Sequence, residues 1–290
     1  MRAALLALAV LATPLAQAEQ VHGFRFHIVT GDDSAQTRRI ADDLYKRLVP
    51  LSAMFRTELA QRRRMVYIAI GPVALRDVAG RKDDCVVISA FTSSHVWRAV
   101  AASAAPARAA AMTAVYAEPA PADQLRLVAL LYKRPVHVAA IIGADTGYLK
   151  AMLRGSAAVE ELAQGDDINR VLNKIAPNEV LLAMPDSAVY NADNIRNILL
   201  STYRHKQGVI GFSADMVKAG ALASTYSDIE DINAQVAEMA AAFVATGELA
   251  PPQFPRYFST IVNEGVARSL DIDVDAAAKE FAHRAAARPR

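Results

Sequence analysis

Short apolar runs alternate with longer segments of helical periodicity along this chain, and this alternation constrains the fold more than any other feature. The helical segments carry their apolar residues on one face, as in the four-residue series Ile40, Leu44 and Leu48. Strands that alternate with helices indicate parallel sheets covered by helices on both faces. An Ala-rich stretch at 276–290 is expected to add a surface helix. The apolar runs lie at residues 24–29, 65–70, 86–90, 136–142, 156–162, 179–184, 208–212 and 257–262.

The strand–helix series is about twice as long as one doubly wound sheet requires. Ala/Pro-rich segments interrupt it at residues 101–111 and 118–121. Such segments can be surface loops, or they can be crossings between two lobes, because proline stiffens a connecting strand. The 290 residues are enough for two medium-sized lobes. We therefore predict an α/β fold with two doubly wound parallel-sheet lobes, a multi-strand hinge, and a cleft at the carboxyl ends of the strands.

The first eighteen residues have the pattern of a secretory signal peptide. Arg2 supplies the positive charge, residues 3–12 form the apolar region, and Pro14 is followed by an Ala-x-Ala pattern at 16–18. The apolar region is shorter than the roughly 20 residues that span a bilayer. No cysteine follows it, which excludes a lipoprotein anchor. We expect cleavage after Ala18 and a periplasmic location for the mature protein.

Charge, cysteine content and motifs exclude several classes of function. The 32 Lys and Arg residues nearly balance the 30 Asp and Glu residues, which argues against a nucleic-acid binder. Cys85 is the single cysteine, so no internal disulfide can form, and its apolar neighbours predict a buried strand residue. The chain lacks a nucleophile elbow, a phosphate loop and a dinucleotide fingerprint, and its histidines lack metal-ligand spacing. Asp271, Asp273 and Asp275 alternate as in a calcium loop, but Ala276 stands where that loop needs glycine. We expect no enzymatic activity, no cofactor and no bound metal.

Three segments in the second half of the chain carry a family resemblance. They are LLAMPDS at 181–187, VIGFSADMV at 209–217 and GALASTY at 220–226. Together with QLRL at 124–127 and the segment at 228–263, they resemble the ABC-transporter substrate-binding protein family of the type I periplasmic-binding fold. The members that they resemble are the short ones associated with aromatic and other amino acids. The likeness covers about the last 170 residues.

The resemblance implies a division of the chain and a function. Residues 19–117 and about 226–250 would form the first lobe, and residues 118–225 and about 251–290 the second, after the signal peptide at 1–18. The mature protein would be a monomer that captures an amino acid or a small carboxylate in the interlobe cleft. It would deliver this ligand to an ABC permease in the inner membrane, with closure of the hinge signalling that the receptor is loaded.

The first lobe departs from the family pattern at two turns. The family has a Gly-Thr-Pro-like turn where this chain has Gly71-Pro72, and a Ser/Thr-Asp-Pro turn where this chain has FTSSH at 91–95. In the family these turns hold the amino acid. The departure keeps a second hypothesis open, in which an exported sensor or accessory module uses the same fold to contact a protein partner instead of feeding a permease.

Candidate ligand-binding residues lie where strands end and turn into helices. Backbone N–H groups at a helix N-terminus, together with the helix dipole, attract a carboxylate. Hydroxyl groups add donors, aspartates accept hydrogen bonds from an ammonium group, and phenylalanine can stack on a ligand. Ser and Asp are also the preferred N-caps, so capping alone remains an alternative for each of them. The candidates are Thr92, Ser93 and Ser94 in the first lobe, and Pro185, Asp186, Ser187, Phe212, Ser213 and Asp215 in the second.

Overall fold

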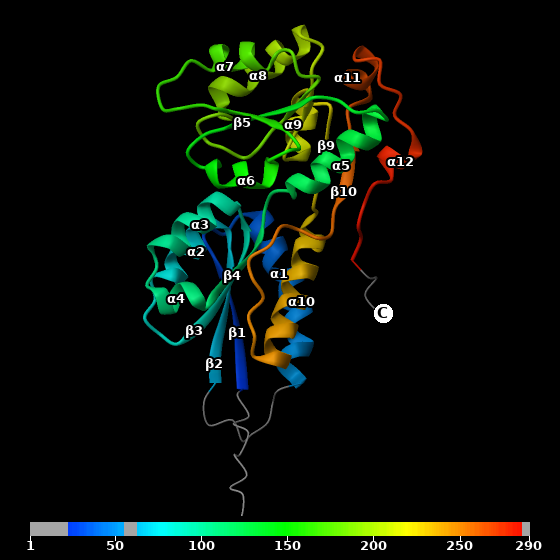
Figure 1. The fold of residues 1–290 in the computed structure, drawn as a ribbon. Coiled ribbons are helices and arrows are strands. Elements are labelled where there is room, and N and C mark those ends of the chain that lie inside the picture. Colours follow the sequence, from blue (N-terminus) through cyan, green and yellow to red (C-terminus); the bar gives the residue numbers. More distant parts are fainter. Residues whose placement is uncertain (1–22, 55–62, 286–290) are drawn as a thin grey trace, which may run out of the picture.

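A computed structural model of the chain describes residues 23–54 and 63–285. The predicted signal peptide at 1–18 lies outside these residues. The described chain forms two sheets, which lie one above the other in Figure 1 and are joined by crossing segments. No helix within the two described ranges is long and apolar enough to cross a membrane.

In the described part of the chain, the first sheet has four parallel strands in the spatial order β1-β2-β3-β4. They are β1 (Gly23–Thr30), β2 (Arg63–Ile70), β3 (Cys85–Thr92) and β4 (Met112–Tyr116). β3 and β4 are buried along almost their whole length, as expected for parallel strands covered on both faces. Cys85 is a buried, free cysteine at the start of β3, as its apolar run predicted.

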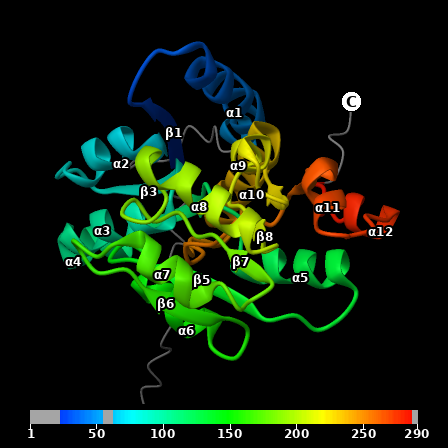
Figure 2. The ribbon, with the colours of Figure 1, turned by 90° about the horizontal axis from the view of Figure 1, so that it is seen from above.

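Helices cover both faces of the first sheet (Figures 1 and 2). On one face, Ile232 of α10 belongs to the same core cluster as Ile40 of α1 and Ile68 of β2. α10 follows the first five strands of the second sheet in sequence, so the chain returns to the first lobe to complete its core. The helices of this face are α1 (Ala35–Met54) and α10 (Ile229–Thr246), and those of the other face are α2 (Gly71–Ala79), α3 (Ser94–Ser103) and α4 (Pro106–Ala110).

Six strands of the described residues form the second sheet, in the order β10-β9-β8-β7-β5-β6. β10 is antiparallel to β9, and the other neighbours are parallel. The chain leaves β5 first to one side and then to the other, which makes the β5/β7 boundary the switch point of the sheet. The strands are β5 (Val138–Ile142), β6 (Ala158–Glu161), β7 (Val180–Leu182), β8 (Gly208–Ile210), β9 (Ala223–Tyr226) and β10 (Ser259–Val262).

Helices also cover both faces of the second sheet, which confirms the predicted fold class of two doubly wound α/β lobes. One face holds α5 (Pro121–Tyr132), the 3-10 turn η1 (Gly147–Leu149), α6 (Lys150–Leu153), α11 (Glu264–Ser269) and α12 (Ala276–Lys279). The other face holds α7 (Ile168–Ile175), α8 (Ala192–Arg204) and α9 (Ala214–Ala219).

Of the two Ala/Pro-rich segments, only residues 118–121 lie at a crossing between the sheets. Residues 101–111 stay in the first lobe, as the end of α3 and as α4. The other crossings lead from β9 to α10 and from α10 back to β10. The last of these also pairs with β4, because the Gln253 N–H donates to Ala114 O at 2.9 Å and the Tyr116 N–H donates to Gln253 O at 3.0 Å. The hinge is therefore tied to the first sheet by backbone hydrogen bonds.

The predicted helix at 276–290 is wrong for residues 280–285, and its last five residues lie outside the described part of the chain. α12 ends at Lys279, and the chain then forms an antiparallel bridge in which the Phe258 N–H donates to His283 O at 2.8 Å and the His283 N–H to Phe258 O at 3.0 Å. The ring of Phe281 packs edge-on against that of Phe258, with centroids 5.1 Å apart. Aromatic burial and backbone pairing here outweigh the helix propensity of alanine, which is worth only a few tenths of a kcal/mol per residue.

Candidate functional site

The carboxyl ends of the two sheets face each other across a small cavity. The segment after β4 reaches it from the first lobe, and the segments after β7 and β8 reach it from the second. Its volume is about 10 Å³, on the order of one water molecule. Two of the sequence-predicted residues, Pro185 and Phe212, line it. The other lining residues are Glu118, Pro119, Pro121, Gln124, Leu149, Ala183, Met184 and Phe254.

Glu118 is the charged residue of this cavity. It lies in the first crossing, between β4 and α5, and is 5% exposed. Its two carboxylate oxygens accept hydrogen bonds from the Ser94 N–H at 2.9 and 3.2 Å, and one also accepts from the Ser94 hydroxyl. Ser94 is the first residue of α3, so the carboxylate lies at the positive end of that helix. Glu118 therefore fills the position that the sequence analysis assigned to a ligand carboxylate.

The backbone that leads into α3 is strained. Phe91 has a positive φ of 55°, at a bulge where β3 shifts its register against β4. Thr92 is buried, and its hydroxyl lies 3.4 Å from Ala90 O. Ser93 holds the N-cap position, but its hydroxyl makes no capping hydrogen bond. Glu118 caps the helix instead, from 24 residues further along the chain.

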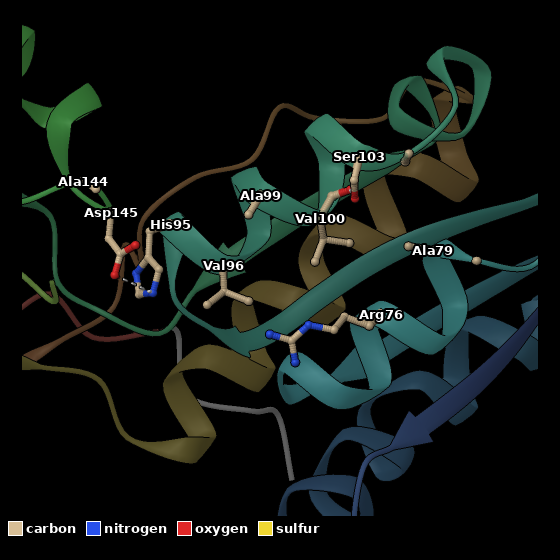
Figure 3. A pocket seen from close by; sticks show the side chains of 11 residues that line it. Arg76, Ala79, His95, Val96, Ala99, Val100, Ser103, Ala144 and Asp145 are labelled. Atoms are coloured by element: carbon tan, nitrogen blue, oxygen red, sulfur yellow. Dashed lines mark hydrogen bonds and ion pairs between the residues drawn. The ribbon is translucent and has the colours of Figure 1, made fainter. Parts of the chain in front are cut away.

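A tyrosine of the second lobe covers Glu118 where α3 contacts the loop after β5, and we call this contact region the interlobe seam. The Tyr148 hydroxyl, from η1, is hydrogen-bonded to the Ser94 hydroxyl. The guanidinium of Arg98 in α3 lies 4.3 Å from the centre of the Tyr148 ring. Nearby, His95 Nε2 is 4.0 Å from Asp145 Oδ2, and Figure 3 shows the two side chains directed toward one another. These contacts join α3 to the loop after β5, so the two lobes are closed against each other.

Burial alters the acid–base properties of this cluster. Removal from water raises the pKa of Glu118, and the hydrogen bonds from Ser94 oppose that rise. Burial also raises the pKa of Tyr148, and it raises the pKa of Tyr116 to about 12. Both tyrosines are therefore neutral at physiological pH, and ionisation of Glu118 is less favourable in the folded protein than in water.

We expect Glu118→Gln to raise the thermal stability of the protein near pH 8 and to change it little near pH 4. A carboxyl whose pKa is raised on folding favours the folded state below its ordinary value of 4.5, and this contribution is lost as the pH rises through the raised pKa. Glutamine keeps an acceptor for Ser94 but does not ionise. The difference in Tm between variant and wild type should therefore grow with pH. A difference in Tm that does not change with pH would contradict the expectation.

Asp186 organises the turn after β7. It is 1% exposed, and its carboxylate accepts five hydrogen bonds from described residues. The donors are the N–H groups of Gly143, Thr146, Ala188 and Val189, at 2.9 to 3.3 Å, and the Thr146 hydroxyl at 2.7 Å. A Cβ at position 143 would lie 2.5 Å from Asp186 Oδ1, so only glycine allows this approach. The carboxylate thus joins the loops after β5 and β7.

The remaining second-lobe candidates make local contacts. Ser187 is exposed and donates to Asp145 from its N–H at 3.1 Å and from its hydroxyl at 2.5 Å. Ser213 is the N-cap of α9 and accepts a backbone N–H at 3.2 Å. The Asp215 side chain is 88% exposed and pairs with a lysine of the same helix. Capping and surface pairing therefore account for Ser213 and Asp215. The predicted residues at the interlobe cavity and seam are Ser94, Pro185 and Phe212.

Comparisons with known proteins place this geometry among solved structures. No protein-family model matches the sequence, and no curated protein matches it. The ligand-free, open structure of a substrate-binding protein with adhesive properties from Clostridium difficile matches with a TM-score of 0.60, at 13% identity over 88% of this chain and 97% of that one. The ABC domain in complex with L-Trp from Streptococcus pneumonia matches with a TM-score of 0.52, at 13% identity over 90% of this chain and 99% of that one.

A third match is a conserved domain protein from Vibrio cholerae, with a TM-score of 0.52 and 14% identity over 89% of this chain and 99% of that one. The chain has the two-lobe type I periplasmic-binding fold. At these identities the likeness shows the fold alone. The sequence prediction of a type I periplasmic-binding fold is confirmed, whereas the amino-acid subtype rests on the resemblance of sequence motifs only.

A wider groove of the type I periplasmic-binding fold lies outside the closed seam (Figure 3). Its volume is about 580 Å³, and it is lined by α2, by α3 and by the loop after β5. Figure 3 shows Arg76 and Ser103 at its first-lobe end and Asp145 at its second-lobe end, with Val96 and Ala99 between them. The groove therefore crosses from one lobe to the other.

Glu118, Tyr148 and Phe254 contribute to the cavity or its seam, and the sequence analysis did not identify them. Glu118 stands in the segment EPAP at 118–121, where the prolines indicated only a linker. The signal that could have identified Glu118 was a single acidic residue in a segment of Ala and Pro. Tyr148 lies in a single 3-10 turn and Phe254 in an irregular crossing, and neither setting has a period that points to one face.

Proposed function

We propose that this protein is an exported solute-binding protein that captures a small molecule between its two lobes for an ABC transporter. The observation that carries the proposal is the cluster at the facing strand ends, to which both lobes contribute. Ser94 and Glu118 approach from the first lobe and its crossing, and Tyr148, Pro185 and Phe212 from the second. A ligand bound at this point would be contacted by both lobes at once. The predicted signal peptide at 1–18 supports delivery from the periplasm to an inner-membrane permease.

Ligand entry requires the lobes to separate, because the present cavity of about 10 Å³ is far smaller than typical small-molecule sites of about 300–1,000 Å³. Separation would break the Ser94–Tyr148 hydrogen bond, the stacking of Arg98 on Tyr148 and the approach of His95 to Asp145. These three contacts are polar, and the crossings between the sheets can serve as a hinge. A ligand that replaces them would favour a closed, loaded state that a permease can distinguish from an open one.

A thermal-shift screen against amino acids, small carboxylates and small amines tests the proposal. A true ligand at about 100 times its Kd stabilises the folded state by about 2.7 kcal/mol, which corresponds to a rise in Tm of about 5–10 °C. Phe212→Ala changes the cavity lining, so this variant should need at least ten times more ligand to reach the same rise in Tm. Tyr203→Ala removes an aromatic side chain that is 59% exposed on α8, and it serves as the matched control. Equal shifts in the two variants would reject the cavity as the binding site.

Contact with a protein partner is a second candidate function, and the groove of about 580 Å³ favours it. Its size and its position across both lobes suit a segment of another protein. In that case the solute screen is negative, and the protein elutes with a partner when native periplasmic extract is fractionated by size. Ala99→Arg, which fills the groove, would then release the partner, whereas Phe212→Ala would not.

A further inference from the structure

Carboxylates of this chain already occupy the anion-binding groups of the cleft. In the first lobe, the Ser94 N–H and hydroxyl at the start of α3 both donate to Glu118. In the second lobe, the N–H groups of the loops after β5 and β7 donate to Asp186, and the Ser187 N–H donates to Asp145. A ligand carboxylate would therefore have to displace one of these groups. The donors of Ser94 and Ser187, which the sequence analysis assigned to a ligand, are therefore satisfied within the chain.

Glu118 lacks a lysine or arginine partner in the described part of the chain. Among residues 23–54 and 63–285, no lysine or arginine makes a hydrogen bond or an ion pair with it. The guanidinium of Arg98 stacks on the Tyr148 ring instead. His95 is the nearest titratable base, and its Nε2 is directed toward Asp145, while its Nδ1 is buried without a partner. A buried carboxylate without a counter-ion is costly, so a cation at this position would be stabilising.

The rest of the cavity lining offers apolar and aromatic surface. Phe212 and Phe254 present rings, and most other lining side chains are aliphatic or proline. Gln124 is the remaining polar lining residue, and its amide is engaged elsewhere, with Nε2 donating to Gly211 O at 2.5 Å and Oε1 accepting the Thr225 N–H at 2.9 Å. Aromatic rings attract cations through their negative faces. The lining therefore combines one carboxylate with surfaces that suit an apolar, positively charged group.

We infer that the solute is an organic cation whose ammonium group binds Glu118 and whose apolar body lies against Phe212 and Phe254. The inference rests on the proposed function, because it places the ligand in the same interlobe cavity. The ammonium supplies the missing counter-charge, and its N–H groups reach the carboxylate lone pairs that Ser94 leaves free. A carboxylate on the ligand is not held by α3, because Glu118 keeps that site. This replaces the ligand class implied by the resemblance, amino acids and small carboxylates, with amines.

A charge series on one carbon skeleton tests this inference. Benzylamine, benzyl alcohol and benzoate are similar in size and carry a positive, zero and negative charge, and phenylalanine carries both charges. Isothermal titration near pH 7.5 at fixed ionic strength keeps surface screening constant. We expect wild type to bind benzylamine at least tenfold more tightly than benzyl alcohol or benzoate. Glu118→Gln should remove that preference, and Glu248→Gln, at an exposed acid after α10, should retain it.

Glu118→Ala provides the complementary measurement. Removal of the carboxylate frees the N–H and hydroxyl of Ser94 at the start of α3, so the variant should lose benzylamine binding and gain a benzoate-dependent rise in Tm. Tighter binding of benzoate or phenylalanine than of benzylamine to wild type would overturn the inference and leave solute binding intact. The absence of binding for all four compounds, together with a negative solute screen, would overturn both.

Discussion

Asp186→Ala is expected to lower the free energy of unfolding by about 3–5 kcal/mol. The substitution removes five acceptor contacts at once, from a carboxylate that is 1% exposed. The N–H groups of Thr146, Ala188 and Val189 and the buried Thr146 hydroxyl would lose this acceptor, whereas the Gly143 N–H would keep its contact with Thr146 Oγ1 at 3.3 Å. Because Gly143 approaches the carboxylate directly, alanine would also leave a void between the loops after β5 and β7.

Urea unfolding, monitored by circular dichroism, measures this effect. Equal m-values for variant and wild type would show that the two proteins expose the same surface on unfolding. Asp186→Asn keeps one acceptor oxygen but turns an NH₂ group toward the remaining donors, so we expect a smaller loss that is still above 1 kcal/mol. Asp193→Ala serves as the control, because this aspartate is exposed in the first turn of α8. A loss of less than about 1 kcal/mol for Asp186→Ala would show that the loops rearrange to satisfy their own donors.

The same turn shows which parts of a site the sequence can predict. The apolar run that ends at Pro185, followed by Asp186 and Ser187, correctly places polar side chains at the carboxyl end of a buried strand. The main partner of Asp186, however, is the Gly143 loop, 43 residues earlier in the chain. Such pairing depends on β5 and β7 being neighbours in space, and a single sequence does not show strand order. The local sequence pattern therefore could not show whether Asp186 caps a helix, joins two loops or contacts a ligand.

The fold was easier to predict from the sequence than the site, because apolar periodicity is a local feature and is strong in this chain. The apolar runs predicted β1 to β3, β5 to β8 and β10, and the helical stripe of α10 that includes Ile232 and Phe243, but they missed β4 and β9. Local composition failed where long-range contacts decide the structure. Phe281 leaves the predicted terminal helix because its ring packs against Phe258. Glu118 was missed because its significance arises from Ser94, 24 residues away, and not from its neighbours in sequence.

Gln124→Leu is expected to lower the free energy of unfolding by about 2–4 kcal/mol. Gln124 is 1% exposed in the first turns of α5, and its amide links that helix to β9 and to the turn after β8. Its Nε2 donates to Gly211 O at 2.5 Å, and its Oε1 accepts the Thr225 N–H at 2.9 Å. Leucine has a similar volume but can do neither, so the Thr225 N–H would be buried without a partner. Thermal and urea unfolding both report the loss.

Ser224→Ala separates the amide's own contribution from that of the surrounding network. The Ser224 hydroxyl also donates to Gly211 O, at 2.9 Å, so this carbonyl keeps one donor in either single variant and loses both in the double variant. A double-mutant cycle should therefore give a coupling energy of about 1–2 kcal/mol, with the double variant less stable than the sum of the single effects predicts. Additive losses would mean that Gln124 acts through packing alone. Since α5 begins at Pro121, directly after the crossing that carries Glu118, a coupled network here would also fix the helix that follows the proposed cation site.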